Sequence, residues 1–203
     1  MSAGGRDVPE RITTGGRHVP ERITTERLVL RRFTAEDTDD RFAYQSLPEV
    51  ARHLYRPPLT RAACAEVIAA RAAGSAWEND GDVLLLAVCR AEEPAAVIGE
   101  VVLTLTAARA GQAEIGWVFA PRHTRRGYAT EAARALVSVA FAQLGAHRVF
   151  ARLDVLNTAS ARVCERLGMR REAHLVENDL DGDRWGSEYV YAVLAREWPE
   201  RKG

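Results

Sequence analysis

The stretch "EIGWVFAPRHTRRGYATEAARALVSVAF", from Glu114 to Phe141, decides the fold, because it joins a strand pattern to a helix pattern through a short basic turn. Its first seven residues are rich in β-branched and aromatic side chains, which favours a strand. From Tyr128 to about Leu144 apolar residues recur at helical spacing, and the pattern stops at Gly145. The stretch therefore predicts a strand, a tight turn and a long amphipathic helix.

The turn has the chemistry of an anion site. Arg125 and Arg126 precede Gly127, and the predicted helix begins at the next residue. A helix N-terminus leaves backbone N–H groups unpaired and carries partial positive charge, and glycine lets a bound group approach the main chain closely. His123 is a further candidate for positive potential here. The turn predicts a phosphate cradle, although a plain strand-to-helix turn with solvated arginines is equally open on this chemistry alone.

The segments on either side predict an α+β fold. Strands are expected at 27–33, 82–90, 95–106, 113–120, 147–155, 171–179 and 185–195, and further helices at 34–47, 59–74 and 157–168. Sequential strands interleaved with helices predict a mixed, mostly antiparallel central sheet flanked by about four helices.

Composition narrows the class of protein. The 203 residues suit one domain, and 28 basic against 28 acidic side chains give no net charge for binding nucleic acid or anionic lipid over the whole surface. Cys64, Cys89 and Cys164 are widely spaced, which argues against a disulfide framework or a zinc site. The longest apolar run, 83–89, is too short to span a bilayer, and the N-terminus lacks a signal-peptide pattern. We expect a cytoplasmic protein.

One repeat precedes the domain. "GGRDVPERITT" at 4–14 returns as "GGRHVPERITT" at 15–25, with Asp7 replaced by His18. Two copies are too few for a solenoid. The repeat predicts a flexible arm over residues 1–23, ahead of a domain spanning 24–200.

Two segments together resemble the GNAT (Gcn5-related) N-acetyltransferase superfamily in order and spacing. The first is the opening stretch, and the second is "HRVFARLDVLNTASARVCERLGMRREA" at 147–173. "TTERLVLRRFTAEDTDD" at 24–40 and the pair Asn157 and Ser160 are similar to the RimJ/RimL-like branch. The resemblance covers about 24–198. It implies the GNAT fold and direct transfer of acetyl from acetyl-CoA to a primary amine, either a protein N-terminus or a small molecule.

The resemblance also implies a donor site. The family's pyrophosphate motif falls on 124–129, where Thr124 and Arg125 depart from the usual residues. A main-chain N–H near Val118 or Phe119 would meet the thioester carbonyl, and Asn157 would cap the short helix and contact the pantetheine arm. The expected cofactor-binding residues are Val118, Phe119, Arg125, Arg126, Gly127, Tyr128, Ala129, Thr130 and Asn157.

The catalytic residues are expected to differ from those of many family members. A tyrosine that protonates the departing thiolate in the family is replaced here by Cys164, which we interpret as a small core residue. The branch implies Ser160 in that role, on the inward face of its helix. Glu114 is the first choice for a general base, and the other candidates are Glu100, Glu177 and Asp179.

The remaining expectations concern partners. No histidine spacing or acidic loop fits a metal site, so acetyl-CoA and an amine are the expected partners, without metal, membrane or nucleic acid, and a homodimer stays open. Because the tyrosine that protonates the thiolate is missing, one alternative to an enzyme stays open: a CoA-binding or sensory module that has lost catalysis. An arginine-based nucleic-acid binder is a second alternative, and it predicts strongly salt-dependent affinity.

Overall fold

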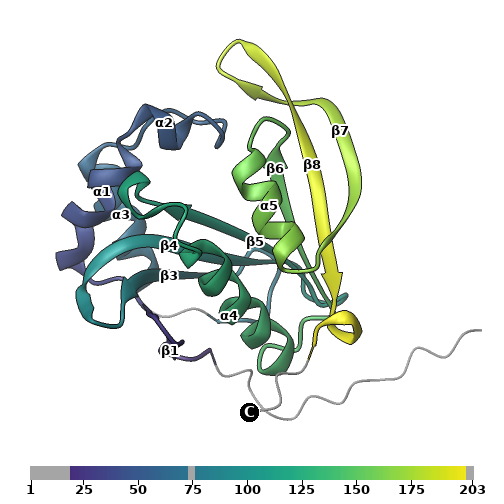
Figure 1. Ribbon diagram of the computed structural model, residues 1–203, viewed down its shortest axis with the longest axis horizontal. Coiled ribbons are helices and arrows are strands. Elements are labelled where there is room, and N and C mark those ends of the chain that lie inside the picture. Colours follow the sequence, from purple (N-terminus) through teal and green to yellow (C-terminus); the bar gives the residue numbers. More distant parts are fainter. Residues whose placement is uncertain (1–18, 73–75, 200–203) are drawn as a thin grey trace, which may run out of the picture.

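A computed structural model of the chain describes residues 19–72 and 76–199. Within these residues eight strands form one sheet in the order β1-β2-β3-β4-β5-β6-β8-β7 (Figure 1). The strands are β1 Arg22–Thr24, β2 Leu28–Arg31, β3 Val83–Arg90, β4 Glu93–Ala107, β5 Gln112–Phe119, β6 Arg148–Asp154, β7 Arg170–Asp181 and β8 Arg184–Leu194. All neighbours are antiparallel except β5 and β6. The predicted mixed, mostly antiparallel sheet is confirmed.

Five α-helices accompany the sheet in the described part of the chain. They are α1 Thr38–Gln45, α2 Pro48–Ala51, α3 Arg61–Ala72, α4 Tyr128–Ala142 and α5 Thr158–Arg166. The helix expected at 34–47 begins with a 3₁₀ turn, Ala35–Asp37, and α2 starts anew at Pro48, which suits the first turn of a helix. The expected end of α3 at Gly74 lies outside the described residues.

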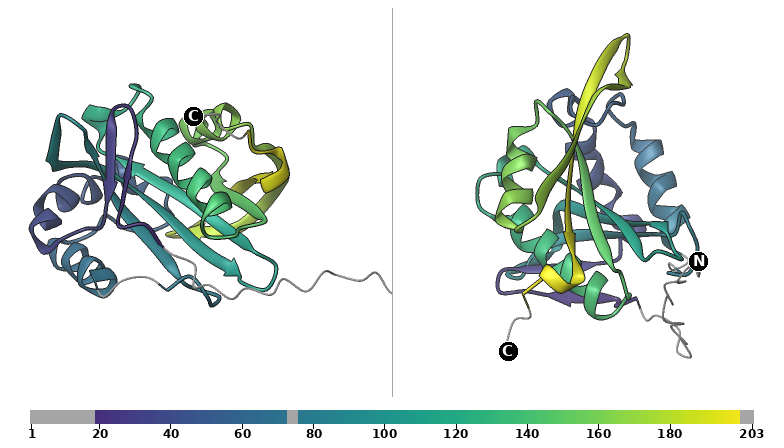
Figure 2. Two further views of the ribbon diagram at one scale, coloured as in Figure 1. Left: turned by 90° about the horizontal axis from the view of Figure 1, so that it is seen from below. Right: turned by 90° about the vertical axis from the view of Figure 1, so that its right-hand side faces the viewer.

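The sheet is covered on both faces. α4 packs against β4 and β5, and α1 packs on β4 from the side that also carries α3 (Figure 2). Alternate residues of β3 serve the two sides, because Leu84 and Leu86 join the core cluster beneath α4 while Leu85 and Ala87 join the cluster beneath α1 and α3. Two buried faces explain why the β3 segment reads as an unbroken apolar run.

The sheet divides into two parts between β5 and β6. These strands pair at only three positions, Gln112 with Arg148, Ala113 with Val149 and Glu114 with Phe150. Beyond Glu114, β5 continues beside β4 and β6 continues beside β8, so the two parts diverge (Figure 1). The edge of β5 from Ile115 to Phe119 is therefore left without a neighbouring strand on its β6 side.

The folded domain begins earlier than expected. Val19 is buried in the main core, and β1 pairs with β2 from Arg22 to Thr24. Residues 19–23, which were expected in a flexible arm, thus belong to the folded domain: Arg22 and Ile23 are in the edge strand β1, and the apolar side chains of Val19 and Ile23 pack in the core. The first copy of the repeat lies outside the described residues. In the parts of the chain that are described, no helix is long and apolar enough to cross a membrane.

Candidate active site

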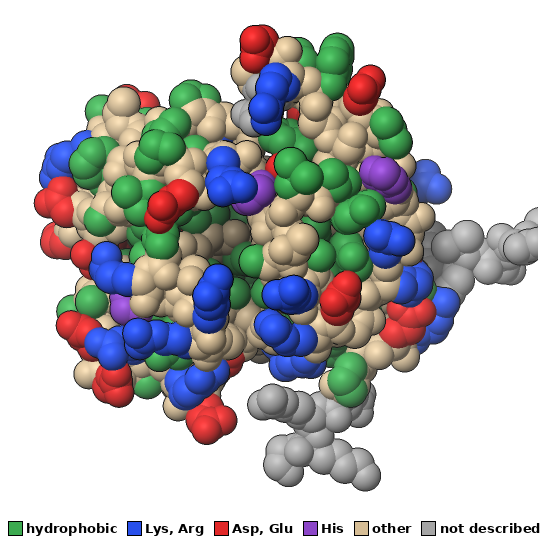
Figure 3. Space-filling view, turned by 45° about the horizontal axis from the view of Figure 1, so that its top comes forward, with side chains coloured by type: hydrophobic (Ala, Val, Ile, Leu, Met, Phe, Trp, Pro, Cys, Tyr) green, Lys and Arg blue, Asp and Glu red, His purple; other side chains and the backbone are tan. Residues whose placement is uncertain are grey.

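A cleft lies where β5 and β6 diverge, bordered by α4 and α5. Its volume is about 1330 Å³, and its walls come from the end of β5, the turn before α4, the first turns of α4 and α5, the β1–β2 turn, and α2 with the residues after it. Figure 3 shows a hollow on this face with basic side chains gathered along its lower side. Drug-sized pockets occupy roughly 300–1,000 Å³, so this cleft has room for a large, extended ligand.

The cleft concentrates positive charge in a chain whose net charge is zero. Its lining includes five arginines, Arg27, Arg125, Arg134, Arg162 and Arg166, against three glutamates, Glu26, Glu49 and Glu131. Arg27 and Glu131 form an ion pair at 2.6 Å, which leaves four arginines against two glutamates. Such a local excess of cations favours an anionic ligand.

The turn before α4 has an unusual backbone. Gly127 is the N-cap of α4 with φ of 82°, and Arg125 has φ of 61°, so both lie in the left-handed region. For Arg125 this conformation costs energy that glycine would avoid. The GNAT family that the sequence resembles commonly has glycine at this position, and the positive φ gives a physical reason for that glycine.

The first turn of α4 offers donors to the cleft. The first hydrogen bond inside the helix runs from the Glu131 N–H to the Gly127 carbonyl at 3.0 Å, so the preceding N–H groups have no intrahelical acceptor. Tyr128, Ala129 and Thr130 line the cleft, and the buried Thr130 hydroxyl has no partner in the structure. Unpartnered donors and nearby arginines fit the diphosphate of a CoA-type cofactor. The side chain of Arg126 is not among the described lining residues.

The β1–β2 turn is fastened to this helix start. The Glu131 carboxylate accepts hydrogen bonds from the Thr25 hydroxyl at 2.6 Å, the Arg27 N–H at 3.0 Å and the Arg27 Nε at 2.7 Å. Burial acts to raise the pKa of Glu131, but these bonds outweigh it and lower the pKa. Arg27 also donates to the Arg126 carbonyl at 3.1 Å. No role for Glu131 or Arg27 could be predicted from the sequence, because their contact joins segments 104 residues apart.

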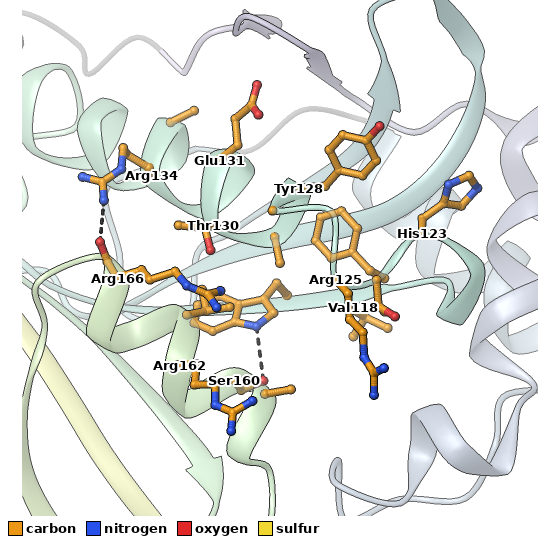
Figure 4. A pocket seen from close by; sticks show the side chains of 18 of the residues that line it. Val118, His123, Arg125, Tyr128, Thr130, Glu131, Arg134, Ser160, Arg162 and Arg166 are labelled. Carbon is orange, nitrogen blue, oxygen red and sulfur yellow. Dashed lines mark hydrogen bonds between the residues drawn. The ribbon is translucent and has the colours of Figure 1, made fainter.

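Ser160 lies on the opposite wall. The Asn157 side chain caps α5 by accepting from the Ser160 N–H at 3.0 Å, which confirms the expected N-cap. The Ser160 hydroxyl accepts from Trp117 Nε1 at 3.3 Å, so it bridges α5 to the diverging end of β5. Figure 4 shows Ser160 on α5 and Thr130 on α4 across the cavity from each other. Because a hydroxyl can accept and donate at once, Ser160 still has its own hydrogen to give.

Cys164 is unsuited to proton donation. It is fully buried and is not one of the described residues that line the cleft. Burial raises the pKa of its thiol to about 12. Cys164 therefore acts as a small residue in the core below α5, as the sequence suggested.

None of the four carboxylates proposed as a base reaches the cleft among the described lining residues. Glu114 lies at the start of β5 and accepts from Arg152 Nε at 3.2 Å, at the end of β5 that still pairs with β6. Glu177 and Asp179 are exposed in the β7–β8 hairpin. The structure does not bring these side chains together with Ser160.

Glu100 is a structural residue on the other face of the sheet. It is buried and accepts from Arg41 Nε at 2.8 Å, Tyr44 Oη at 2.8 Å and Gln45 Nε2 at 2.9 Å. Its oxygens are therefore engaged in joining α1 to β4. The i, i+3 and i+4 spacing of these partners is visible in the sequence, but the glutamate that they share is not.

His123 contributes no charge to the cleft, contrary to expectation. Burial, followed by the nearby Arg122 and Arg126, lowers the pKa of His123. Its Nε2 accepts from Arg122 Nε at 3.1 Å, which requires a neutral ring with this nitrogen unprotonated. The described residues contain no group of three metal-ligating side chains.

A second histidine, His53, lines the cleft from the segment after α2. Its Nδ1 lies 2.9 Å from Oδ2 of Asp154 at the end of β6. The histidine spacing predicts no metal ligand, and no other role for His53 could be predicted from the sequence. No local signal could have joined it to an aspartate 101 residues away.

Comparisons with known proteins agree with this geometry. The sequence profile of the "Acetyltransferase (GNAT) domain" matches residues 27–170. "Uncharacterized N-acetyltransferase YnaD" of Bacillus subtilis (strain 168) is 42% identical over 85 residues, which cover 42% of this chain and 50% of that protein. "Uncharacterized N-acetyltransferase p20" of Bacillus licheniformis is 28% identical over 174 residues, covering 86% of this chain and 96% of that protein.

A solved structure extends the agreement to the fold. The crystal structure of an acetyltransferase (GNAT family) from Bacillus anthracis has a TM-score of 0.78 at 29% identity, covering 87% of this chain and 99% of that one. The chain therefore belongs to the GNAT acetyltransferase family. The expected GNAT fold is confirmed, and so is the expectation of an N-acetyltransferase at the level of the family.

Proposed function

We propose that the protein transfers an acetyl group from acetyl-CoA directly to a primary amine. The observation that carries this proposal is the placement, in one cleft, of the cationic start of α4 and the Ser160 hydroxyl on α5. The first suits the diphosphate of the donor and the second suits its thioester end. The unpaired edge of β5 near Val118 and Phe119 lies between them and supplies backbone groups for the acetyl carbonyl.

The proposed residues act in binding and proton transfer. The N–H groups of Tyr128, Ala129 and Thr130, with Arg125, hold the diphosphate, and Asn157 contacts the pantetheine arm from the start of α5. Bound acetyl-CoA supplies the activated acyl group. The Ser160 hydroxyl, held by Trp117, donates a proton to the departing thiolate.

We further propose the RimJ/RimL-like branch, on the strength of the segment 24–40 and the pair Asn157 and Ser160. This branch favours a protein N-terminus as acceptor, with a small-molecule amine as the second candidate. An α-amine with a pKa of about 7.7–8.0 is partly neutral near pH 7, whereas a lysine amine near 10.4 is not. A cytoplasmic location, a catalytic domain ending near residue 200 and a homodimer belong to the same proposal.

The test is acetyl-CoA-dependent thiol release with a panel of amines. Peptides with a free α-amine and polyamines form its two arms, and acceleration by either arm supports an acetyltransferase and selects the acceptor class. Ser160→Ala is expected to lower kcat by about 100-fold while leaving the Kd of acetyl-CoA unchanged. Binding of acetyl-CoA with no release from any amine would favour a CoA-binding or sensory module. Steeply salt-dependent binding of nucleic acid would favour an arginine-based nucleic-acid binder.

Gly127→Val separates a donor site from a simple turn. A Cβ at Gly127 would meet no atom closer than 3.4 Å, so the expected loss of stability comes only from the left-handed backbone and amounts to about 1–2 kcal/mol. The branched side chain would stand where the diphosphate approaches the main chain. We expect acetyl-CoA affinity, measured by calorimetry, to fall at least about 100-fold, or about 2.7 kcal/mol. Equal losses of affinity and stability would favour the simple turn.

A further inference from the structure

The contact between His53 and Asp154 joins the two parts of the molecule across the cleft. His53 follows α2, which lies with α1 on one side, and Asp154 ends β6 on the other side. The distance from Nδ1 to Oδ2 is 2.9 Å, the Asp154 side chain is 7% exposed, and the His53 side chain is 19% exposed. His53 lines the same cleft as Ser160. His53 therefore borders the cleft of the proposed reaction, with the buried Asp154 carboxylate behind it.

The hydrogen bonds of Asp154 fix the tautomer of His53. Its Oδ1 accepts from the Leu156 N–H at 2.7 Å, and its Oδ2 faces His53 Nδ1. A carboxylate oxygen accepts hydrogen bonds and does not donate them. His53 Nδ1 must then carry the hydrogen, so in the neutral ring Nε2 holds the lone pair. A base needs such a lone pair, and a carboxylate behind the ring would stabilise the imidazolium that forms.

The segment that carries His53 is also held on β8. Tyr55 adopts φ of 47°, and its hydroxyl donates to the Ser187 carbonyl at 3.1 Å. Its ring lies over Gly186, where a Cβ would come within 2.5 Å of it. Only glycine allows this close approach. Two contacts, one through Asp154 and one through Tyr55, thus fix the position of His53 before any substrate binds.

We propose that His53 is the general base for the acceptor amine and that Asp154 is its positioning residue. This inference rests on the proposed acetyltransferase function. The amine nitrogen forms a bond to the thioester carbon, and its surplus proton passes to His53 Nε2. The C–S bond then breaks, and the thiolate takes a proton from the Ser160 hydroxyl. His53 returns its proton to solvent and Ser160 regains one from solvent, so the sum is amide plus free thiol. Glu49, Arg125 and Arg162 are among the other charged side chains that line the cleft.

The test compares three variants in the thiol-release assay, each with acetyl-CoA affinity and thermal unfolding measured alongside. His53→Gln is expected to lower kcat by about 100-fold, with the Kd of acetyl-CoA changed less than about twofold. Asp154→Asn is expected to lower kcat by about tenfold or more, because an amide can donate to Nδ1 and favour the wrong tautomer. His147→Gln, an exposed histidine at the opposite end of β6, is the matched control and is expected to equal the wild type.

A second readout does not depend on turnover. Nitrogen-15 NMR of the wild-type protein is expected to show neutral His53 protonated on Nδ1, and Asp154→Asn is expected to shift the population toward the Nε2–H form. An Nε2–H tautomer in the wild type would overturn the proposal whatever the activity. An active wild type with His53→Gln within about threefold of it would overturn the base and leave the acetyltransferase intact. A wild type that binds acetyl-CoA yet acetylates no amine would overturn both.

Discussion

Arg125 and Arg126 offer a matched test of the strained turn. Both are exposed, both precede α4 by a few residues, and each becomes glycine by the same change. Only Arg125 has a positive φ, of 61°, whereas Arg126 is not among the described residues with positive φ. Only Arg125 is among the described residues that line the cleft. We therefore expect Arg125→Gly and Arg126→Gly to differ in both stability and binding.

The magnitudes follow from the backbone. A left-handed conformation costs a non-glycine residue about 1–2 kcal/mol, and Arg125→Gly removes this cost. Glycine also increases the conformational entropy of the unfolded chain, and this lowers the stability of both variants by about 0.5–1 kcal/mol. The net expectation is about 0.5–1 kcal/mol of added stability for Arg125→Gly and a loss of similar size for Arg126→Gly. The difference in Tm is about 4 °C for a chain of this size.

Binding is expected to change in the opposite order. Removing the Arg125 charge beside a bound diphosphate costs about 1 kcal/mol, which raises the Kd of acetyl-CoA by about fivefold. Removing the Arg126 charge costs less, since its side chain does not line the cleft. Urea denaturation and calorimetry measure the two effects. If Arg125→Gly proves no more stable than Arg126→Gly, the turn is not strained at Arg125 and the reasoning fails.

Two further predictions concern the buried carboxylates. Glu100→Ala leaves the buried Arg41 without its counter-charge and is expected to cost about 3–5 kcal/mol in urea denaturation. Glu114→Ala breaks only a partly exposed ion pair and is expected to cost less than about 1 kcal/mol, so equal losses would contradict the network. Burial acts to raise the pKa of Asp37, but the hydrogen bonds from Arg31 and Thr34 and the Arg31 charge together outweigh it and lower the pKa. The stabilising contribution of Asp37 is therefore present above the ordinary aspartate pKa of about 3.9 and is lost as the pH falls through the lower folded value. The unfolding free energy of Asp37→Asn is accordingly expected to fall less steeply between about pH 5 and pH 2 than that of the wild type. Parallel curves would show that Asp37 does not contribute to the pH dependence of stability.

The part of the cleft formed by the starts of α4 and α5 could be predicted from the sequence because its signals are local. Arg125, Gly127 and the first turn of α4 are consecutive, and Asn157 caps the helix that carries Ser160 only three residues later. Helix starts, turns and caps depend on neighbours in the chain, so a short window contains the whole argument.

The residues proposed for proton transfer from the amine could not be predicted in this way. Whether a glutamate is a base or a structural acceptor depends on its tertiary partners, and Glu100 meets Arg41 from 59 residues away. The partner of His53 lies still further along the chain. Glu114 has the right residue type on the right strand, but it stands at the end where β5 and β6 remain paired. Strand membership alone does not say which end of a strand faces the substrate.

The duplicated segment means that one edge of the sheet is encoded twice. The seven residues 19–25, "VPERITT", contain β1 and part of the cleft wall, and the same seven letters stand at 8–14. Loss of either eleven-residue copy, by deletion or by a later start of translation, leaves one "VPERITT" directly before Glu26. A chain that loses one copy therefore keeps every residue of β1, whereas a chain that loses both copies lacks β1 and part of the cleft wall.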